Sequence, residues 1–211
     1  MLRLFYAPGA CSLAPHIALY EAGAEFEAVR LDLKAGDQKK PDYIAVNPKG
    51  RVPALVTPRG TLTEVPVILG WIANLFPKAQ LKPEGDFFAF SQMQSFNAYL
   101  SSTVHVSFAH LIRPERWADS EAARAELKAK TPSNLKLHLE LVEEMLDDGR
   151  PWVMGGQYTV ADPYLYVFAR WLEREGAGGA APFPRLKAHR DRMQQRPAVA
   201  AALAAEGIAA L

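Results

Sequence analysis

The chain opens with a strand-turn-helix unit that carries its only cysteine. The apolar run at residues 4–6 is typical of a short strand, and Pro8-Gly9 follows it as a turn. Apolar residues then recur at helical spacing, which predicts a helix that begins near Cys11 or Ser12 and stops at Gly23. Cys11 is therefore expected at a helix N-terminus, where unpaired backbone amides favour a thiolate and can lower the pKa of a cysteine.

Two interpretations of Cys11 are open at this point. A free cysteine is among the most buried residue types and often packs as a small hydrophobe. The flanking Pro-Gly turn and Ser12 favour instead a thiol presented at the start of a helix. Because the chain has one cysteine, it can form no internal disulfide and no multi-cysteine metal site.

The first 77 residues alternate strands and helices. Alternation of apolar and polar residues, together with short apolar runs, predicts four strands, at residues 4–6, 26–33, 54–56 and 61–63. Helices are expected near residues 12–22, 43–46 and 64–76, with a polar loop over residues 34–42. Two parallel strands joined by a helix, followed by a hairpin and a covering helix, describe an α/β domain.

Everything after a linker-like stretch at residues 78–86 is predicted to be helical. Apolar residues recur at every third or fourth position from Met93 to Leu111, which predicts one long helix. Arg113-Pro114 ends it. Further helices are expected at residues 120–146, after a capping box of Thr159 and Asp162, and at residues 183–195 and 197–205. We therefore predict an α/β domain over residues 1–77, a linker over 78–86 and an all-α helical bundle over 87–211.

Composition narrows the function classes. The formal net charge is +1 and the basic residues are dispersed, so we expect no nucleic-acid partner. No apolar stretch approaches the ~20 residues that span a bilayer, and no signal-peptide pattern is present, so we expect a cytoplasmic protein with no membrane partner. The five histidines are scattered, which predicts no metal. Phosphate-binding glycine loops and a Gly-x-Ser-x-Gly elbow are also absent.

Three further positions are candidates for ligand contacts. If the Val52-Pro53 bond is cis, Val52 can present its backbone N–H and C=O to an extended peptide. Glu64 and Val65 open a helix, where backbone N–H groups suit a carboxylate, although an acidic residue there can simply complement the helix dipole. His105 lies beside the apolar stripe of the long helix and can equally be a half-buried structural histidine.

These residues lie in a set of recognisable motifs: Pro8-Gly9-Ala10-Cys11-Ser12-Leu13-x-Pro15-His16-Ile17, Asn47-Pro48-Lys49-Gly50-x-Val52-Pro53-Ala54-Leu55, Leu62-Thr63-Glu64, Thr159-Val160-Ala161-Asp162 and Arg196-Pro197-Ala198-Val199. Over nearly the whole chain, the sequence resembles the cytosolic glutathione transferases. The first motif most resembles the bacterial beta class.

The resemblance implies a thioredoxin-like N-terminal domain, an all-helical C-terminal domain and a homodimer, with glutathione bound as co-substrate at the N-terminal domain. Val52, next to a cis Pro53, would offer its backbone to the cysteinyl part of glutathione. Glu64 and the Val65 N–H would hold the γ-glutamyl end.

The same resemblance places two side chains near the glutathione sulfur and one near its glycyl carboxylate. Cys11 and His105 would face the sulfur. Lys34, or another lysine of that loop, would meet the glycyl carboxylate.

Three departures from the family pattern bear on glutathione affinity. Val65-Pro66 stands where the family usually has serine or glycine, so a hydroxyl contact is lost while the backbone contact survives. Ala98 stands where beta-class relatives place an asparagine near glutathione, and we assign that contact to the adjacent Asn97. Thr103 replaces an acidic residue expected to reach the partner subunit's ligand.

An enzyme of this kind keeps glutathione as a thiolate, and the candidate donors are the helix amides, Ser12, Tyr6 and His105. The thiolate would attack a small hydrophobic electrophile in a pocket between the domains, near Ala10, Phe108 and Trp117 or Trp171. Cys11 could also form a mixed disulfide with glutathione and exchange it onward. A glutathione-dependent isomerase or dehalogenase and a non-catalytic glutathione-binding protein are the alternatives.

Overall fold

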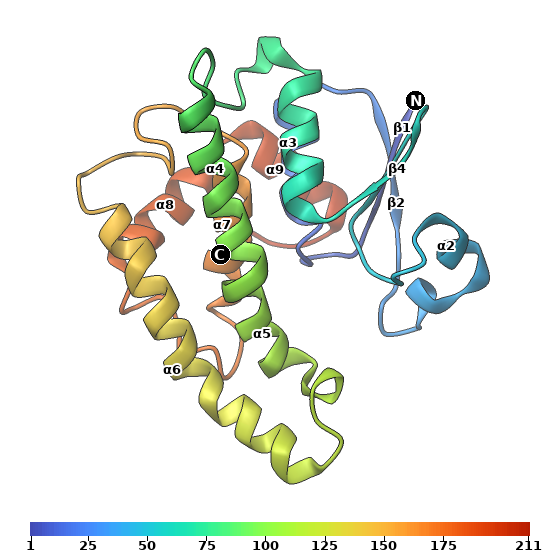
Figure 1. The fold of residues 1–211 in the computed structure, drawn as a ribbon, viewed down its shortest axis with the longest axis vertical. Helices are drawn as coiled ribbons and strands as arrows, with labels where there is room; N and C mark the ends of the chain where they lie inside the picture. Colours follow the sequence, from blue (N-terminus) through green and yellow to red (C-terminus); the bar gives the residue numbers. More distant parts are fainter.

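A four-stranded sheet forms the N-terminal part of the chain, seen in a computed structural model that describes all residues 1–211 (Figure 1). The order is β2-β1-β3-β4, from strands β1 (Leu2–Tyr6), β2 (Phe26–Arg30), β3 (Ala54–Thr57) and β4 (Gly60–Thr63). Strand β1 pairs parallel with β2 and antiparallel with β3, and β3 forms the predicted hairpin with β4. The parallel pair requires a crossover, which helix α1 (Leu13–Glu21) supplies.

Strand β2 ends at Arg30, three residues before the end that the alternation predicted. The Leu31 N–H still donates to the Tyr6 carbonyl at 2.8 Å, but Asp32 then turns the chain. The Asp32 carboxylate accepts from the Lys34 N–H at 2.8 Å. Such side-chain bonds to nearby backbone compete with the strand ladder, so the alternating pattern continues past the end of the strand.

Helix α1 begins at Leu13, so Cys11 lies just before the helix rather than within it. Ser12 occupies the N-cap position but makes no capping bond. Its hydroxyl instead accepts from the Ala7 N–H at 3.1 Å and donates to the Ala7 carbonyl at 3.3 Å, which closes the turn between β1 and α1.

The other helices of the N-terminal part are α2 (Pro41–Val46) and α3 (Val65–Leu75), with single 3-10 turns η1 (Asp37–Lys39) and η2 (Pro77–Ala79). Helices α1 and α3 pack together on the side of the sheet that faces the helical part (Figure 1). Tyr43 of α2 packs against Phe5 and Ala54 of the sheet in a small separate core. The expected thioredoxin-like arrangement is confirmed.

Eight segments follow: α4 (Phe87–Tyr99), η3 (Leu100–Val104), α5 (His105–Ile112), η4 (Pro114–Arg116), α6 (Glu121–Met145), α7 (Ala161–Trp171), α8 (Pro184–Gln194) and α9 (Pro197–Glu206). The predicted long helix is present, but η3 is a π-helical turn inside it, directly before His105. Single π turns occur frequently at functional sites, and periodicity alone does not reveal one.

Helix α7 is the buried centre of the helical part, as its apolar composition predicted. Asp162 reaches back as predicted, since its Oδ2 accepts from the Thr159 N–H at 2.8 Å, but the N-cap residue is Val160 rather than Thr159 and makes no side-chain capping bond. A single cluster of 44 buried residues runs from the sheet through α1 into α7, so the two parts share one hydrophobic core. From the end of α3 and the start of α4 we propose the same division, 1–77, 78–86 and 87–211. None of the helices combines the length and hydrophobicity that crossing a membrane requires.

Candidate functional site

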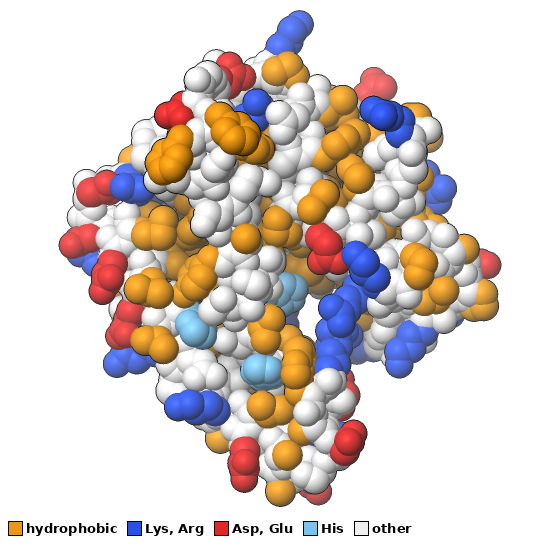
Figure 2. Space-filling view, in the orientation of Figure 1, with side chains coloured by type: hydrophobic (Ala, Val, Ile, Leu, Met, Phe, Trp, Pro, Cys, Tyr) orange, Lys and Arg blue, Asp and Glu red, His pale blue; other side chains and the backbone are white.

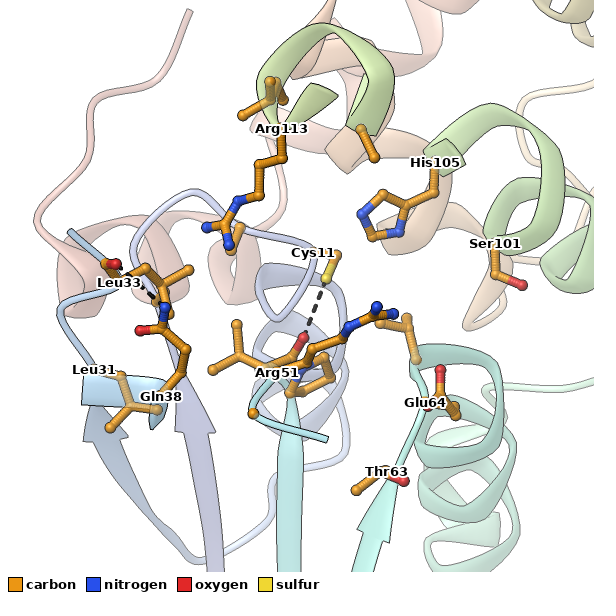
Figure 3. Close-up of a pocket in the computed structure, with 18 of the residues that line it drawn as sticks. Cys11, Leu31, Leu33, Gln38, Arg51, Thr63, Glu64, Ser101, His105 and Arg113 are labelled. Carbon is orange, nitrogen blue, oxygen red and sulfur yellow. Dashed lines mark hydrogen bonds between the residues drawn. The ribbon is translucent and has the colours of Figure 1, made fainter. Parts of the chain in front are cut away.

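A cavity of about 640 Å³ lies between the ends of the strands and the helices α5 and α7. Its volume is within the range of small-molecule sites. The loop before α1, the turn before β3 and the start of α3 form one wall, and α5 forms the opposite one (Figure 3). Both parts of the chain therefore contribute to it.

Most of the predicted site residues line this cavity. From the N-terminal part these are Cys11, Lys34, Val52, Pro53, Glu64 and Val65, and from the helical part His105. Of the residues expected around the electrophile, Ala10, Trp117 and Trp171 also line it. Sequence positions far apart thus meet in one space.

Four predicted residues lie outside the cavity, and their roles stay predictions. The Tyr6 hydroxyl donates to the Ala205 carbonyl at 3.3 Å, and the Ser12 hydroxyl is bonded to Ala7, so neither faces the cavity. Asn97 is fully buried in α4 because it lies on the core side of that helix. Phe108 is also fully buried, and its ring supports Trp171 from behind at 5.4 Å between centroids.

The environment of Cys11 contradicts the expected low thiol pKa. The side chain is 7% exposed, and its Sγ donates to the Val52 carbonyl at 3.5 Å. Burial raises the pKa of the Cys11 thiol to about 12, against a smaller lowering by the backbone N–H groups of Cys11 and Ser12. The amides at the helix start act in the predicted direction, but the loss of solvation is the larger effect.

His105 is half-buried at the start of α5, facing the cavity (Figure 3). Its ring packs against Phe168 and Trp171, at 5.7 Å and 5.2 Å between centroids. Burial, with the charges of Arg116 and Arg51, lowers the pKa of His105 to about 4. The ring is therefore neutral at pH 7 and can donate one N–H hydrogen bond without carrying a charge.

The Val52-Pro53 peptide bond is cis, the isomer that would present the Val52 backbone to a peptide. The turn before it is held by two bonds to the Arg51 carbonyl, at 2.6 Å each, from the Tyr43 hydroxyl and the Asn47 side-chain amide. Sequence reasoning missed both roles. Asn47 could have been found as the first residue of a polar turn that precedes the candidate Val-Pro pair.

Glu64 adopts a backbone conformation that is rare for a residue with a side chain, with φ 69° and ψ 123°. Its carbonyl accepts the first helical bond of α3, from the Ile68 N–H at 3.0 Å, while Lys49 Nζ lies 2.7 Å from its carboxylate. Strained residues of this kind cluster at ligand sites. The Val65 N–H lies in the first helical turn and has no acceptor within the helix, so it is free for an anion.

The turn that carries Ala10 and Cys11 is held by the C-terminal helices. Glu206 accepts from the Gly9 N–H at 2.8 Å, and the Gly9 carbonyl accepts from Trp171 Nε1 at 2.9 Å and from Arg174 at 3.2 Å. These contacts fix the position of the thiol. They join residues more than 160 positions apart, and no local pattern pointed to them.

The cavity is strongly cationic, which the overall net charge of +1 hides. The space-filling view shows Lys and Arg side chains along the hollow, with histidine side chains nearby (Figure 2). The charged residues that line it are six cations and two carboxylates: Arg30, Lys34, Arg51, Arg113, Arg116 and Arg174, with Asp32 and Glu64. Dispersed in the sequence, these arginines gave no signal. The chain brings together no group of three or more metal-ligating side chains.

A short thiol peptide with two carboxylates fits this donor set. The Val52 backbone can pair with an extended peptide, the start of α3 and the cations suit carboxylates, and Cys11 and His105 both line the cavity. The fold is that of the glutathione S-transferases, and the chain belongs to this family. The family model "Glutathione S-transferase, N-terminal domain" matches residues 1–74, and "Glutathione S-transferase, C-terminal domain" matches residues 105–206.

Individual relatives match this chain over nearly its full length. The chain is 38% identical to glutathione S-transferase GstA of Escherichia coli O157:H7, covering 98% of this chain and all of that protein. A glutathione transferase homologue from Sulfitobacter, solved with bound glutathione, superposes with a TM-score of 0.91 at 39% identity, covering 99% of each chain. The beta-class enzyme of Sphingomonas chungbukensis has a TM-score of 0.85 at 40% identity, over 98% of this chain and all of that one.

Proposed function

We propose that this protein is a glutathione transferase of the beta class that joins the glutathione thiolate to hydrophobic electrophiles. The observation that carries the proposal is the convergence of Cys11, Val52 and His105 on one cavity whose far end is the start of α3. The backbone of Val52 binds the cysteinyl part, and Glu64 with the Val65 N–H holds the γ-glutamyl end. Lys34 meets the glycyl carboxylate.

Three groups stabilise the thiolate in this proposal. The Cys11 thiol, protonated at neutral pH, turns its one S–H from the Val52 carbonyl, which the bound peptide then occupies, to the glutathione sulfur. Neutral His105 donates a second hydrogen bond from the opposite wall. The N–H groups at the start of α1 add a favourable field. The sulfur then attacks the electrophile against the apolar wall formed by Val106, Trp117 and Trp171.

Thiol-disulfide exchange through Cys11 is a second candidate activity. It is favoured by the position of Sγ on the cavity wall, 3.5 Å from the Val52 carbonyl. The raised pKa of the Cys11 thiol argues that attack by Cys11 is slow, because the thiolate is the nucleophile. Conjugation is therefore the main proposed activity and exchange the minor one.

One experiment separates these activities. The mass of the intact protein is measured after incubation with oxidised glutathione, for the native chain and Cys11→Ala, beside conjugation rates with chlorodinitrobenzene. We expect slow adduct formation in the native chain only, and conjugation that persists at a reduced rate in Cys11→Ala. Equal conjugation rates and no adduct would remove Cys11 from the mechanism.

Additional measurements separate the alternative functions. Retention on a glutathione column without turnover of any electrophile would indicate a non-catalytic binding protein. Chloride release or isomerisation that leaves no glutathione conjugate would indicate a dehalogenase or isomerase. His105→Ala serves as the site control, since loss of both binding and turnover is expected only if the cavity is the glutathione site.

We further propose a homodimer located in the cytoplasm. Exposed apolar side chains on the neighbouring helices α3 and α4 support a subunit contact there, namely Val67, Phe87 and Phe88. Sedimentation of the native chain and of Phe88→Glu tests the dimer, and we expect the variant to sediment as a monomer. Cell fractionation tests the location.

A further inference from the structure

Four of the five arginines that line the cavity differ from most others in the chain, while the fifth, Arg174, donates to the Gly9 carbonyl. Most arginines elsewhere are engaged with the protein itself, as in the pairs Arg196–Glu21 and Arg150–Asp148. Within the cavity, the side chains of Arg30, Arg51, Arg113 and Arg116 make no hydrogen bond or ion pair with any residue of the chain. Their donors are therefore available to a ligand.

Two of these guanidinium groups come from the helical part, on the wall expected to hold the electrophile. Arg113 follows the last residue of α5, and Arg116 ends η4 directly before Trp117. Figure 3 shows the Arg113 side chain reaching into the cavity on one side of Cys11, with Arg51 on the other. Burial and then the charges of Arg113 and Arg51 lower the pKa of the Arg116 guanidinium, so these like charges act on one another.

The surroundings of this pair are apolar. Val106, Ala109 and Ile112 face the cavity from α5, and Trp117 and Trp171 complete the wall. An occupant that satisfies both features has an aromatic or similarly apolar body and an anionic group at one end. Guanidinium groups favour carboxylates in particular, because their paired N–H groups match two oxygens.

Glutathione alone does not account for the pair. Its γ-glutamyl carboxylate is assigned to the start of α3, and its glycyl carboxylate to Lys34, near which Arg30 also lies. Both assignments use the N-terminal part, whereas Arg113 and Arg116 lie on the helical part. Two cations without a carboxylate partner repel one another, and a bound anion would relieve that repulsion.

We propose that the second substrate is an anionic electrophile, an apolar and preferably aromatic carboxylate, whose carboxylate is bound by Arg113 and Arg116. The inference rests on the proposed function, since it names the substrate class of the same site. The cationic cavity also offsets the repulsion between a thiolate and a carboxylate, which would otherwise slow their reaction.

Chlorodinitrobenzoate and its methyl ester form a matched pair of probes. In both, the glutathione sulfur forms a bond to the ring carbon that carries chlorine, and the carbon–chlorine bond breaks. Chloride leaves with the bonding electrons, and the thiol proton passes to solvent, so no oxidant or reductant is needed. The two probes differ only in the charge at the far end of the ring.

The measured quantity is the ratio of kcat/KM for the acid to that for the ester, each corrected by its uncatalysed rate with glutathione. We expect Arg113→Gln and Arg116→Gln each to lower this ratio about tenfold, the loss expected for one charge-assisted hydrogen bond. Arg59→Gln is the matched control, because Arg59 has no side-chain partner but lies in the β3–β4 turn, outside the cavity. It should leave the ratio unchanged.

A ratio that is unchanged in both cavity variants overturns the inference while the transferase proposal stands. A raised KM for glutathione with an unchanged ratio also overturns it, because the arginines would then bind glutathione. If the native chain turns over neither probe, the proposed function fails instead.

A binding measurement with ligands that cannot react tests separately whether the cavity binds the carboxylate. Dinitrobenzoate and its methyl ester lack the leaving group, and quenching of tryptophan fluorescence reports their binding beside Trp117 and Trp171. Tighter binding of the acid than of the ester, with an affinity ratio that Arg113→Gln lowers about tenfold, supports the inference. Equal binding of acid and ester overturns it.

Discussion

His16 Nδ1 lies 2.9 Å from Glu206 Oε1, and both side chains are completely buried where α1 meets α9. The other carboxylate oxygen of Glu206 accepts from the Gly9 N–H, two residues before Cys11. One carboxylate near the C-terminus thus holds both the first helix and the turn that positions the thiol. The geometry of the site depends on the docking of the helical part.

We expect Glu206→Gln to lower the free energy of unfolding by roughly 3 kcal/mol, because a buried histidine and a backbone donor lose their charged partner. Urea denaturation measures the change. The control is Glu140→Gln, which removes an exposed pair with Lys136 at 3.7 Å and should cost less than about 0.5 kcal/mol. Equal effects of the two substitutions would contradict the structural role of Glu206.

A second buried carboxylate fixes the start of α7. Asp162 accepts from the N–H groups of Val153 and Thr159, at 2.8 Å each, and lies 3.0 Å from His189 Nε2. We expect Asp162→Asn to destabilise the fold by about 3 kcal/mol in thermal or urea unfolding. Asp191→Asn, which weakens a half-exposed pair with Lys187 and a longer contact with Arg190 at 3.4 Å, should cost less than about 1 kcal/mol.

Alkylation of Cys11 should be slow and strongly pH-dependent. With a thiol pKa raised by burial to about 12, the thiolate fraction rises about tenfold per pH unit throughout pH 7–10. The rate of iodoacetamide labelling, followed by intact mass, should show the same slope. The urea-unfolded chain is the control and should react like an ordinary thiol. A rate that levels off below pH 8 would indicate a low thiol pKa and revive the original expectation.

His105 makes the fold sensitive to acid. Because its folded-state pKa is lowered to about 4, the unfolded state binds more protons between about pH 6.5 and pH 4. Stability should therefore fall as the pH drops through this window and be unaffected by His105 above it. Relative to His105→Gln, the native chain should lose about 2 kcal/mol between pH 7.5 and pH 4.5 in urea titrations. Parallel pH dependence of the two chains would be inconsistent with a buried neutral ring.

Local patterns were sufficient for most of the fold. Strand alternation, helical spacing and turn residues act over a few positions, so the helix after Cys11, the hairpin at β3–β4 and the capping box of Asp162 were predictable. The errors were also local in origin. The alternating pattern of β2 ran past its end because Asp32 bonds the nearby backbone, and the π turn before His105 leaves no periodic signature.

Motif positions were likewise enough to name part of the cavity lining, including Val52, Glu64 and His105. Tyr6, Ser12 and Asn97 were also predicted from chain position, but whether such a residue reaches the cavity depends on where its side chain points. Each of these side chains lies beside the site in sequence and outside the cavity in space.

The order of the elements, the helix start beside Cys11 and the family motifs can be read from the chain alone, since these depend on neighbouring residues. The chemistry of the site depends on the folded arrangement. Solvation and charge act through space, so the pKa values of Cys11 and His105 follow from burial by distant segments. For the same reason, Arg51 and Arg113 become part of one cationic surface only after folding, although they lie far apart in the chain.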